Sequence, residues 1–510
     1  MTSPGHLGAG SPEPGSPRSP EGRAHQLYID GAWCEAASGA RREAESPSSG
    51  KAFATVAWGG AEDAARAVVA AAAAAPGWAA LSAFDRAAWC DRVVAGIEAR
   101  RDELARSLSE DQGKPLLTEA ADEVEELAVY FRMAGEDARR LEGRMPPSVD
   151  ASRRALCYRV PLGVVGVVSP WNWPYTMGAE LFAPALAAGN TVVWVPAPTT
   201  AACSALLAEV VAGTDPPPGV FNLVSGAGPV VGDAVVSHPL VSGVGFIGSV
   251  ATGHRVATRA AGKAQVLELG GNGPMVVLED ADLDLAVPAV LESAYLCAGQ
   301  SCTAGERFVV HRSRRAELVE AVVAATSERV RLGDPFDPRT TMGPLNNEPT
   351  AAKTEAHVAD AVSRGARVAT GGRRAGGHPT GLFYEPTVLD GVTPEMAVAT
   401  EETFGPVVPV MEVSSDAEAL DLVNCSPHGL LAAVFTADLG RGLAFAEAAH
   451  AGWVNVNLST NVWESQLPFG GRAGTVSGRG RVGGASVMEA FTEPKTVLIG
   501  PGRAGGREWV

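Results

Sequence analysis

Cysteine is scarce in this sequence: seven of its 510 residues are cysteines, an odd number, and they are spread along the chain. They do not form the dense disulfide framework of a small secreted protein, so we expect a reducing, cytoplasmic compartment. The sequence also lacks an apolar run of about 20 residues, the length that crosses a bilayer. Its longest apolar stretches are interrupted by Pro76–Gly77 or spaced by Gly163 and Gly166. We therefore expect no membrane span.

Basic residues are in the minority, with 41 Lys and Arg against 58 Asp and Glu and a formal net charge of -17. Such a surface repels nucleic-acid phosphates and anionic lipid headgroups, so neither is an expected partner. The signatures GxxxxGKS, GxxxxGKT, HExxH and GxSxG are absent as well. Their absence argues against P-loop nucleotidases, zincin metalloproteases and hydrolases with a nucleophile elbow, and we expect no metal site.

The composition that remains, 46% hydrophobic and 19% charged, is typical of a large soluble globular protein with two or three structural units. Residues 1–24 are rich in Pro, Gly and Ser and predict a disordered tail. Between residues 160 and 246, and again after residue 274, short β-branched runs alternate with helical patterns. This alternation predicts an α/β fold with two doubly wound parallel-sheet domains.

The N-terminal part of the chain is mainly helical in pattern. We predict helices over residues 61–75 and 84–109 and a third from Pro115 to Leu141. Pro115 suits the first turn of a helix, and the acidic run Glu119–Glu126 would lie near the favourable N-terminal end of the helix dipole.

Two glycine-rich segments could bind a phosphate. The segment Gly226–Gly232 is one residue too long for the dinucleotide fingerprint and is more typical of an ordinary strand-to-helix turn. The segment Gly248–Gly253 follows a predicted strand and begins a helix, so its backbone N–H groups and the Ser249 hydroxyl could meet an anionic phosphate. We consider this second segment the better phosphate site.

The segment from Cys297 to Gly305 is the most informative, because Cys302 lies there among small residues instead of large apolar ones. Small neighbours leave room for another molecule to approach the sulfur, as a nucleophile requires. A zinc site would need further Cys or His at ligand spacing, and the nearest candidate, His311, falls in a predicted strand. From this segment alone, a nucleophile and an inert thiol remain equally open.

Five motifs together resemble the aldehyde dehydrogenase superfamily. They are PWNWP (170–174), LELGGNGP (267–274), GQSCTAG (299–305), EETFGPV (401–407) and LPFGG (467–471), in that family's order. The resemblance extends from about Leu27 to Val497. It implies oxidation of an aldehyde to a carboxylic acid with NAD or NADP.

The resemblance also implies roles for three residues. Cys302 corresponds to the thiolate that attacks the aldehyde, forming a thiohemiacetal and then a thioester. Asn172 corresponds to an amide donor to the developing oxyanion, a kind of contact whose removal typically costs about 2.7–4 kcal/mol. Glu268 corresponds to the general base that activates water for thioester hydrolysis. The alternative for Glu268 is a salt-bridged structural carboxylate.

For the cofactor, the resemblance implies that Ser249, with Gly248, contacts the pyrophosphate. It also implies that Glu402 and Phe404 hold the nicotinamide ribose and bracket the ring, with Trp171 nearby.

The sequence departs from the family pattern at Val195 and Pro198, where many members have a Lys and a Glu that hold the adenosine ribose. Losing one charge-assisted hydrogen bond costs about 1.5–3 kcal/mol, so weaker cofactor binding is expected, and the choice between NAD and NADP is open. Leu181 and Val482 similarly replace a Lys and a Glu, which removes both members of a charged pair and leaves no orphan charge.

The substrate is suggested by side chains on segments that border the tunnel in the family. The aromatic ones either line that tunnel, favouring an apolar or aromatic aldehyde, or pack in the core: Trp173, Tyr175, Trp463 and Phe469. Glu180 and Glu464 would instead suit an amino-aldehyde, and we find no Arg placed to receive the carboxylate of a semialdehyde.

The resemblance implies a domain plan. Residues 25–140 and 160–268 would form the cofactor-binding domain, residues 269–460 the catalytic domain, and residues 141–159 and 480–500 a small β oligomerisation unit of a homodimer or homotetramer. Two alternatives to a hydrolytic dehydrogenase remain. One is a CoA-acylating member, against which Glu268 argues, and the other is a non-catalytic binding or structural protein that has lost its hold on the cofactor.

Overall fold

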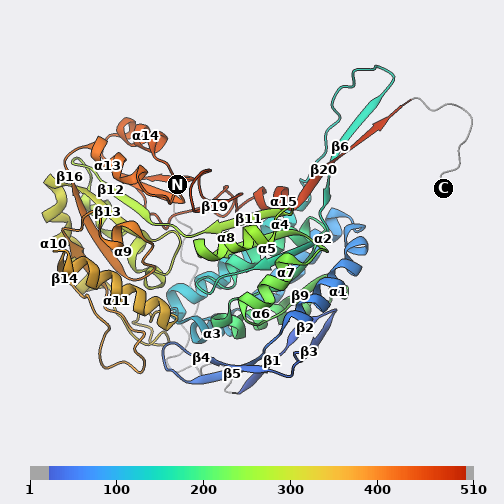
Figure 1. Cartoon of the computed structure of the whole chain (residues 1–510), viewed down its shortest axis with the longest axis horizontal. Helices are drawn as coiled ribbons and strands as arrows, with labels where there is room; N and C mark the ends of the chain where they lie inside the picture. Colours follow the sequence, from blue (N-terminus) through green and yellow to red (C-terminus); the bar gives the residue numbers. More distant parts are fainter. Residues whose placement is uncertain (1–21, 501–510) are drawn as a thin grey trace, which may run out of the picture.

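The computed structural model describes residues 22–500. The predicted tail therefore lies outside the described residues except for its last three, and two of these, Arg23 and Ala24, belong to strand β1. Strand β1 (Arg23–His25) joins β5 (Ala52–Ala57) and β4 (Arg41–Glu45) in a three-stranded sheet with the order β1-β5-β4. Two larger sheets and a projecting two-stranded arm complete the molecule (Figure 1).

The first large sheet has eight strands in the order β19-β11-β10-β7-β8-β9-β2-β3. Its strands are β2 (Leu27–Ile29), β3 (Ala32–Cys34), β7 (Val164–Val168), β8 (Thr191–Val195), β9 (Phe221–Leu223), β10 (Val241–Gly248), β11 (Ala264–Leu269) and β19 (Gly478–Arg479). Strands β7 to β11 are parallel, whereas β2 and β19 pair antiparallel to their neighbours. The strand order reverses between β7 and β10, and ligands of such sheets bind beyond the strand ends at this switch point.

Helices cover both faces of this sheet. They are α1 (Ala61–Ala79), α2 (Ala83–Ala99), α3 (Arg101–Gln112), α4 (Ala121–Ala138), α5 (Thr176–Ala187), α6 (Ala201–Ala212), α7 (Asp233–Ser237), α8 (Val250–Arg259) and α15 (Ser486–Ala490). Alternate residues of β8 enter different cores: Val192 and Trp194 pack with α2, α4, α5 and α6, and Val193 and Val195 with α1, α7 and α8. This pattern explains why the strand is apolar along its whole length, since both faces of a parallel sheet are buried.

The second large sheet has the order β14-β15-β16-β13-β12-β17-β18 and is parallel except for β14. Its strands are β12 (Gly273–Val277), β13 (Gly305–His311), β14 (Arg367–Thr370), β15 (Thr387–Asp390), β16 (Val407–Val413), β17 (Leu431–Phe435) and β18 (Trp453–Val456). Its helices are α9 (Leu283–Tyr295), α10 (Arg312–Arg329), α11 (Glu348–Ser363), α12 (Ala397–Thr400), α13 (Asp416–Asn424) and α14 (Leu439–Ala448). The predicted α/β class with two doubly wound sheets therefore holds.

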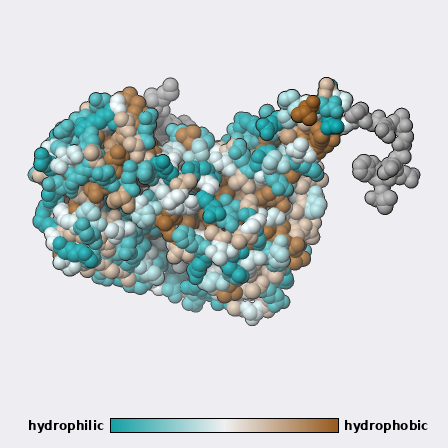
Figure 2. Space-filling view, turned by 45° about the horizontal axis from the view of Figure 1, so that its top comes forward, coloured by the Kyte–Doolittle hydropathy of each residue, from teal (hydrophilic) through white to brown (hydrophobic). Residues whose placement is uncertain are grey.

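The arm consists of β6 (Arg154–Pro161) and β20 (Thr492–Ile499), which pair antiparallel in continuous register. It extends away from the body of the molecule (Figure 1). Apolar side chains on the arm are exposed, with Tyr158 at 40%, Leu498 at 56% and Ile499 at 49%, and hydrophobic residues gather there in Figure 2. The arm thus presents apolar side chains and strand edges that nothing in this chain covers among the residues described.

Three helix predictions were wrong in detail. The helix predicted over residues 84–109 is two helices, because Arg100 leaves helical geometry and pairs with Glu103 and Glu209. The helix predicted over residues 61–75 continues through Pro76, in the last turn of α1, to Ala79. After Pro115 the chain forms a π-helical turn, η1 (Leu116–Ala120), before α4 begins. Other short turns are η2 (Pro198–Thr200), η3 (Gly228–Gly232) and η4 (Leu296–Gly299). None of the helices in residues 22–500 is both long and apolar enough to cross a membrane.

A buried ion pair joins these N-terminal helices to the first large sheet. Lys114 Nζ lies 2.6 Å from Glu123 Oε2, and both side chains are fully buried. The other carboxyl oxygen of Glu123 accepts the backbone N–H groups of Tyr175 and Thr176 at 2.9 and 3.3 Å, at the start of α5. Lys114 Nζ also lies 3.6 Å above the ring of Trp173.

Replacing Lys114 by Met should destabilise the protein strongly, because it leaves the Glu123 carboxylate buried without its partner. We expect a loss of about 3–5 kcal/mol, measured by denaturant unfolding or as a large drop in the apparent melting temperature. The matched control is Arg101→Met, which removes an exposed pair with Glu125 and should change stability by about 0–1 kcal/mol. Equal effects of the two substitutions would contradict this account.

Candidate active site

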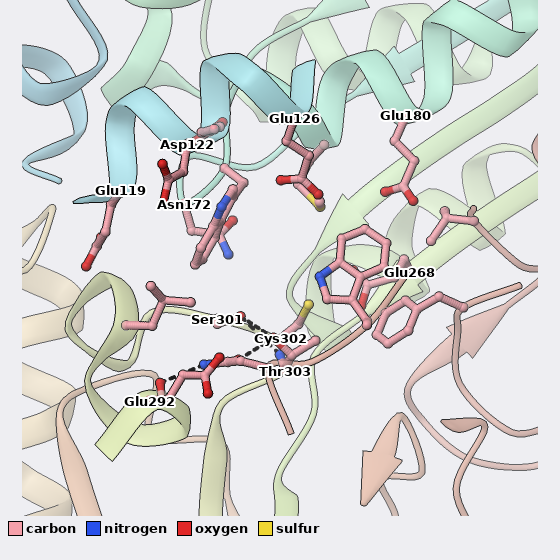
Figure 3. A pocket seen from close by; sticks show the side chains of 18 of the residues that line it. Glu119, Asp122, Glu126, Asn172, Glu180, Glu268, Glu292, Ser301, Cys302 and Thr303 are labelled. Atoms are coloured by element: carbon pink, nitrogen blue, oxygen red, sulfur yellow. Dashed lines mark hydrogen bonds between the residues drawn. The ribbon is translucent and has the colours of Figure 1, made fainter. Parts of the chain in front are cut away.

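A cavity of about 430 Å3 lies between the two large sheets, and Cys302, Glu268 and Asn172 all line it (Figure 3). Asn172 follows β7, Glu268 lies on β11, and Cys302 precedes β13 of the other sheet. The three residues are far apart in the sequence, and the packing of the two sheets brings them to one cavity.

The backbone before Cys302 is held in a rare conformation. Cys297, Ala298 and Gly299 all have left-handed φ angles of 52°, 53° and 74°. Glu119 accepts the N–H of Cys297 at 3.1 Å, and the Gln300 carboxamide accepts the N–H of Asn346 at 2.8 Å. Such strained turns persist only where surrounding contacts hold them, and they cluster at functional sites.

The Cys302 thiol is half-buried at the centre of the cavity. Burial raises its pKa well above the usual value, and the neighbouring carboxyl of Glu268 raises it further. Without a bound ligand the sulfur therefore keeps its proton at neutral pH.

Asn172 is oriented by the same turn. Its side-chain amide nitrogen donates to the Gln300 carbonyl at 3.0 Å. A carboxamide nitrogen carries two hydrogens, so the second one remains available on the side of the cavity. This geometry suits a donor to a negatively charged oxygen.

Glu268 is buried, and its Oε1 atom has no hydrogen-bond partner among the described residues. Burial raises the pKa of this carboxyl to about 8; the Cys302 thiol opposes the rise, and the charge of Glu402 adds to it. None of the ion pairs in residues 22–500 includes Glu268, so the geometry gives no support to a salt-bridged structural role.

A second cavity, of about 520 Å3, lies at the switch point of the first sheet. Its walls include Val168 at the end of β7, Phe246 of β10, the η3 turn and one side of α8. Ser249, directly after Gly248, is the exposed N-terminal cap of the ten-residue helix α8. Backbone N–H groups at such a helix end are suited to a phosphate. The segment Gly226–Gly232 forms the π-helical turn η3 that leads into α7 and contributes Gly228 and Gly232 to this cavity.

The family resemblance assigns Glu402, Phe404 and Trp171 to the nicotinamide region. Glu402 accepts the N–H of Gly271 at 2.9 Å, and burial raises its pKa to about 7. Phe404 has a left-handed φ of 59°, and its N–H donates to Glu306 at 2.6 Å. The rings of Phe404 and Trp171 meet edge to face at 5.5 Å. An open helix end, an adjoining cavity and two paired rings are features that fit a dinucleotide.

The four departures from the family pattern all lie within apolar or turn structure. Val195 is 1% exposed in the core beneath α1 and α8, and Pro198 begins the short turn η2. Leu181 and Val482 are both buried in one core cluster. The side chains of Val195 and Pro198 cannot form a hydrogen bond with a ribose. Leu181 and Val482, where many family members have a charged pair, contribute apolar packing instead.

The tunnel residues separate into two groups. Trp173, Trp463, Phe469 and Glu180 line the cavity. Tyr175 does not: it is fully buried, and its hydroxyl donates to the Leu104 carbonyl at 3.1 Å. Glu464 does not either, because its exposed side chain pairs with Gln466.

The sequence analysis missed several acidic residues that also line the cavity: Glu119, Asp122, Glu123, Glu126 and Glu292. Asp122 and Glu126 are four residues apart on α4, a spacing that places them on one helix face. That spacing could have indicated that both carboxyls face the same cavity, but we had interpreted the acidic run only as favourable to the helix dipole. In residues 22–500, no group of three or more His, Cys, Asp and Glu side chains is arranged to hold a metal ion.

Comparison with known proteins agrees with this geometry. Residues 33–497 match the aldehyde dehydrogenase family. The chain is 37% identical to 3-sulfolactaldehyde dehydrogenase of Pseudomonas putida over 93% of this chain and 97% of that protein. It is 36% identical to an NADP-dependent succinate-semialdehyde dehydrogenase of Escherichia coli, over 93% and 98%. A crystal structure of betaine aldehyde dehydrogenase from Staphylococcus aureus with NAD+ superposes with a TM-score of 0.90 at 32% identity, over 95% of this chain and 97% of that one.

The chain therefore belongs to the aldehyde dehydrogenase family. The predicted class of activity, NAD- or NADP-dependent oxidation of an aldehyde to a carboxylic acid, is confirmed by this membership, as is the predicted fold class.

The accessibility of the cysteines provides a test of the site geometry. Iodoacetamide should label exposed Cys425 quickly and Cys302 more slowly at pH 7, with the Cys302 rate rising as pH rises, because burial and Glu268 hold its pKa high. Cys297 should stay unlabelled, since it is 3% exposed and its pKa is raised to about 12 by burial. Peptide mass mapping reads out the sites, with Cys302→Ser as the control. Labelling of Cys297 as fast as that of Cys302 would show that the turn before Cys302 opens.

Proposed function

We propose that Cys302, Asn172 and Glu268 carry out the aldehyde oxidation. The observation that supports this most is their meeting in one cavity from three separate elements. The Cys302 thiol gives up its proton to water as its sulfur adds to the aldehyde carbon, forming a C–S bond while the C=O π electrons move to oxygen. The second amide hydrogen of Asn172 and the backbone N–H of Cys302 stabilise that oxygen, a kind of contact worth about 2.7–4 kcal/mol for each donor.

NAD or NADP, when bound, supplies the acceptor for the hydride that leaves the aldehyde carbon. A thioester then remains on Cys302. Glu268, as its carboxylate, takes a proton from water, the resulting hydroxide adds to the thioester carbon, and the C–S bond breaks. The products are the carboxylic acid and the free Cys302 sulfur. Since CoA would resolve the thioester without such a base, the presence of Glu268 favours hydrolysis over CoA acylation.

The proposed cofactor site consists of Gly248, Ser249, Trp171, Glu402 and Phe404. Ser249 and the N–H groups at the start of α8 would hold the pyrophosphate, and the cavity beside α8 has the volume for a nucleoside. Val195 and Pro198 leave the ribose without a charged partner and place no carboxylate against a 2′-phosphate. Both NAD and NADP are therefore candidates, and the meeting of Cys302, Asn172 and Glu268 in one cavity argues against a non-catalytic protein.

We further propose that residues 25–140 and 160–268 form the cofactor-binding domain and residues 269–460 the catalytic domain. Residues 141–159 and 480–500 would be the oligomerisation segments, since they contain parts of the exposed arm. The chain would act as a homodimer or homotetramer, in which a partner covers the arm. All seven cysteines are free thiols, which supports a cytoplasmic location.

Replacing Glu268 by Gln should slow steady-state oxidation roughly 100- to 10,000-fold while sparing the first turnover. A single stoichiometric burst of reduced cofactor, seen by stopped-flow absorbance, should be followed by a near stop. In the wild type, turnover should rise with pH through about 8, because only the deprotonated Glu268 carboxylate can accept a proton. This rise should be absent in the variant.

The control is calorimetric titration of both proteins with NAD and with NADP, which should give the same affinities in each. Full steady-state turnover by the Gln variant would contradict the proposed role. Binding of neither cofactor by the wild type would restore the non-catalytic alternative.

Charged residues on the arm should dissociate the oligomer. The double substitution Leu498→Glu and Ile499→Glu places two charges on exposed apolar positions of β20, and sedimentation velocity should show a shift to monomer. The matched control is Leu439→Glu with Leu443→Glu, two equally exposed positions on α14, which should leave the sedimentation coefficient unchanged. An unchanged oligomer in the arm variant would assign assembly to another surface.

A further inference from the structure

The cavity around Cys302 holds more acidic groups than the proposed chemistry uses. Seven of its nineteen lining residues are Asp or Glu, and none is Lys, Arg or His. Glu268 is the proposed base, Glu119 holds the turn before Cys302, and Glu123 is paired with Lys114. Four acidic residues have no role in the proposed chemistry or in these contacts: Asp122 and Glu126 on α4, Glu180 on α5 and Glu292 on α9.

Glu180 is the most informative of the four. It is 2% exposed, yet neither of its carboxyl oxygens has a hydrogen-bond partner of normal geometry in the described residues. Its carboxyl points from α5 into the cavity, on the same side as those of Glu126 and Asp122 (Figure 3). Buried polar groups almost always have a hydrogen-bond partner. We therefore expect a molecule bound in the cavity to be the partner of Glu180.

The neighbouring carboxyls add negative charge around Glu180. Burial raises the pKa of Glu180 well above its ordinary value, and the charges of Glu268 and Glu126 raise it further, against the N–H of Gly483. Burial, followed by the charge of Glu123, raises the pKa of Glu126 to about 7. A cation placed between these carboxyls would offset both burial and mutual repulsion, because an opposite charge at close range favours the ionised form.

The charge of Lys114 lowers the pKa of Glu126 but does not offset the effect of burial. Lys114 is already engaged by Glu123 and by the face of Trp173, and it is not part of the cavity wall.

Aromatic rings form another part of the wall. Trp173, Trp463 and Phe469 line the cavity, and the rings of Trp463 and Phe469 lie 5.5 Å apart. Ring faces attract cations, and carboxylates combined with such faces are the usual surroundings of an ammonium or quaternary ammonium group. The ring face of Trp173 already binds one ammonium group, that of Lys114.

We propose that the aldehyde substrate carries a positively charged ammonium group, which Glu180 and Glu126 bind with the help of the aromatic wall while the aldehyde carbon reaches Cys302. The inference rests on the proposed function, since it names the substrate class of the same site. It differs from the substrates named for the relatives at 36% and 37% identity, succinate semialdehyde and sulfolactaldehyde, which are anions, whereas the structure at 32% identity is named for betaine aldehyde, a quaternary ammonium aldehyde. An anion would enter a cavity with seven acidic groups and no basic one in its lining.

The test compares two aldehydes of the same shape that differ in charge, together with an anionic one. Trimethylammonioacetaldehyde and its uncharged isostere tert-butylacetaldehyde have the same shape, and succinate semialdehyde supplies the anionic case. We expect kcat/KM for the cation to exceed that for the isostere by at least about tenfold, and the anion to be the poorest of the three. The cationic nitrogen also activates its aldehyde carbon, but this effect is the same in every variant, so a change in the ratio between variants isolates recognition of the charge.

Two variants assign the effect to residues. Glu180→Gln and Glu126→Gln keep the side-chain shape and should each lower that ratio about tenfold, or to near one. The matched control is Glu464→Gln, which removes an acidic group outside the cavity and should leave the ratio unchanged. Because the isostere is measured in every variant, a folding defect lowers both numbers and does not imitate a loss of charge recognition.

A ratio near or below one in the wild type, or preference for the anion, would overturn the inference while leaving the proposed oxidation in place. If no aldehyde is oxidised with either cofactor, the proposed function itself fails, and binding then decides the inference. Calorimetry then compares choline with the uncharged alcohol in which a carbon replaces the choline nitrogen. Choline should bind and the uncharged alcohol should not. The affinity for choline should be weaker in Glu180→Gln. Absence of choline binding by the wild type would overturn the inference there too.

Discussion

The site depends on the buried ion pair between Lys114 and Glu123. One oxygen of Glu123 holds Lys114, and the other caps the first N–H groups of α5. Lys114 in turn rests on the ring of Trp173, which immediately follows Asn172 in the sequence. A single pair therefore fixes the end of α3, the start of α5 and the loop that carries the proposed oxyanion donor. A buried pair of this kind adds little net stability but is costly to break, so its main effect is to specify one arrangement of these segments.

The second constraint is the way the two sheets meet. The β11 strand ends at Leu269 and β12 of the other sheet begins at Gly273, so the chain passes from one sheet to the other beside Glu268. This crossing buries the carboxyl and raises its pKa, whereas the same residue on an exposed strand would be an ordinary acid. The proposed base thus owes its proton affinity first to burial where the two sheets meet, and the charge of Glu402 adds to it.

Much of this could be predicted from the sequence. The alternation of β-branched runs and helical patterns predicted both sheets, and five short motifs identified the residues around Cys302. What could not be predicted depends on side-chain direction: Tyr175 and Glu464 lie on the predicted tunnel segments but point away from the cavity, while Asp122 and Glu126 point into it from a helix we had considered only for its dipole. The break at Arg100 was also hidden, because tertiary pairing with Glu209 and not a helix-breaking residue causes it. Periodicity assigns a residue to an element, but packing alone decides what its side chain faces.

The raised pKa values have a consequence for the cavity as a whole. Glu119 and Glu126 titrate at about 7 and Glu268 at about 8, in each case because burial comes first among the causes. As pH rises from mildly acidic to mildly alkaline, these three carboxyls lose their protons and the cavity gains negative charge. The surrounding medium, by supplying or withdrawing protons, sets the electric field that an approaching molecule meets. The charge that the cavity presents to a ligand therefore differs between solutions below and above neutral pH.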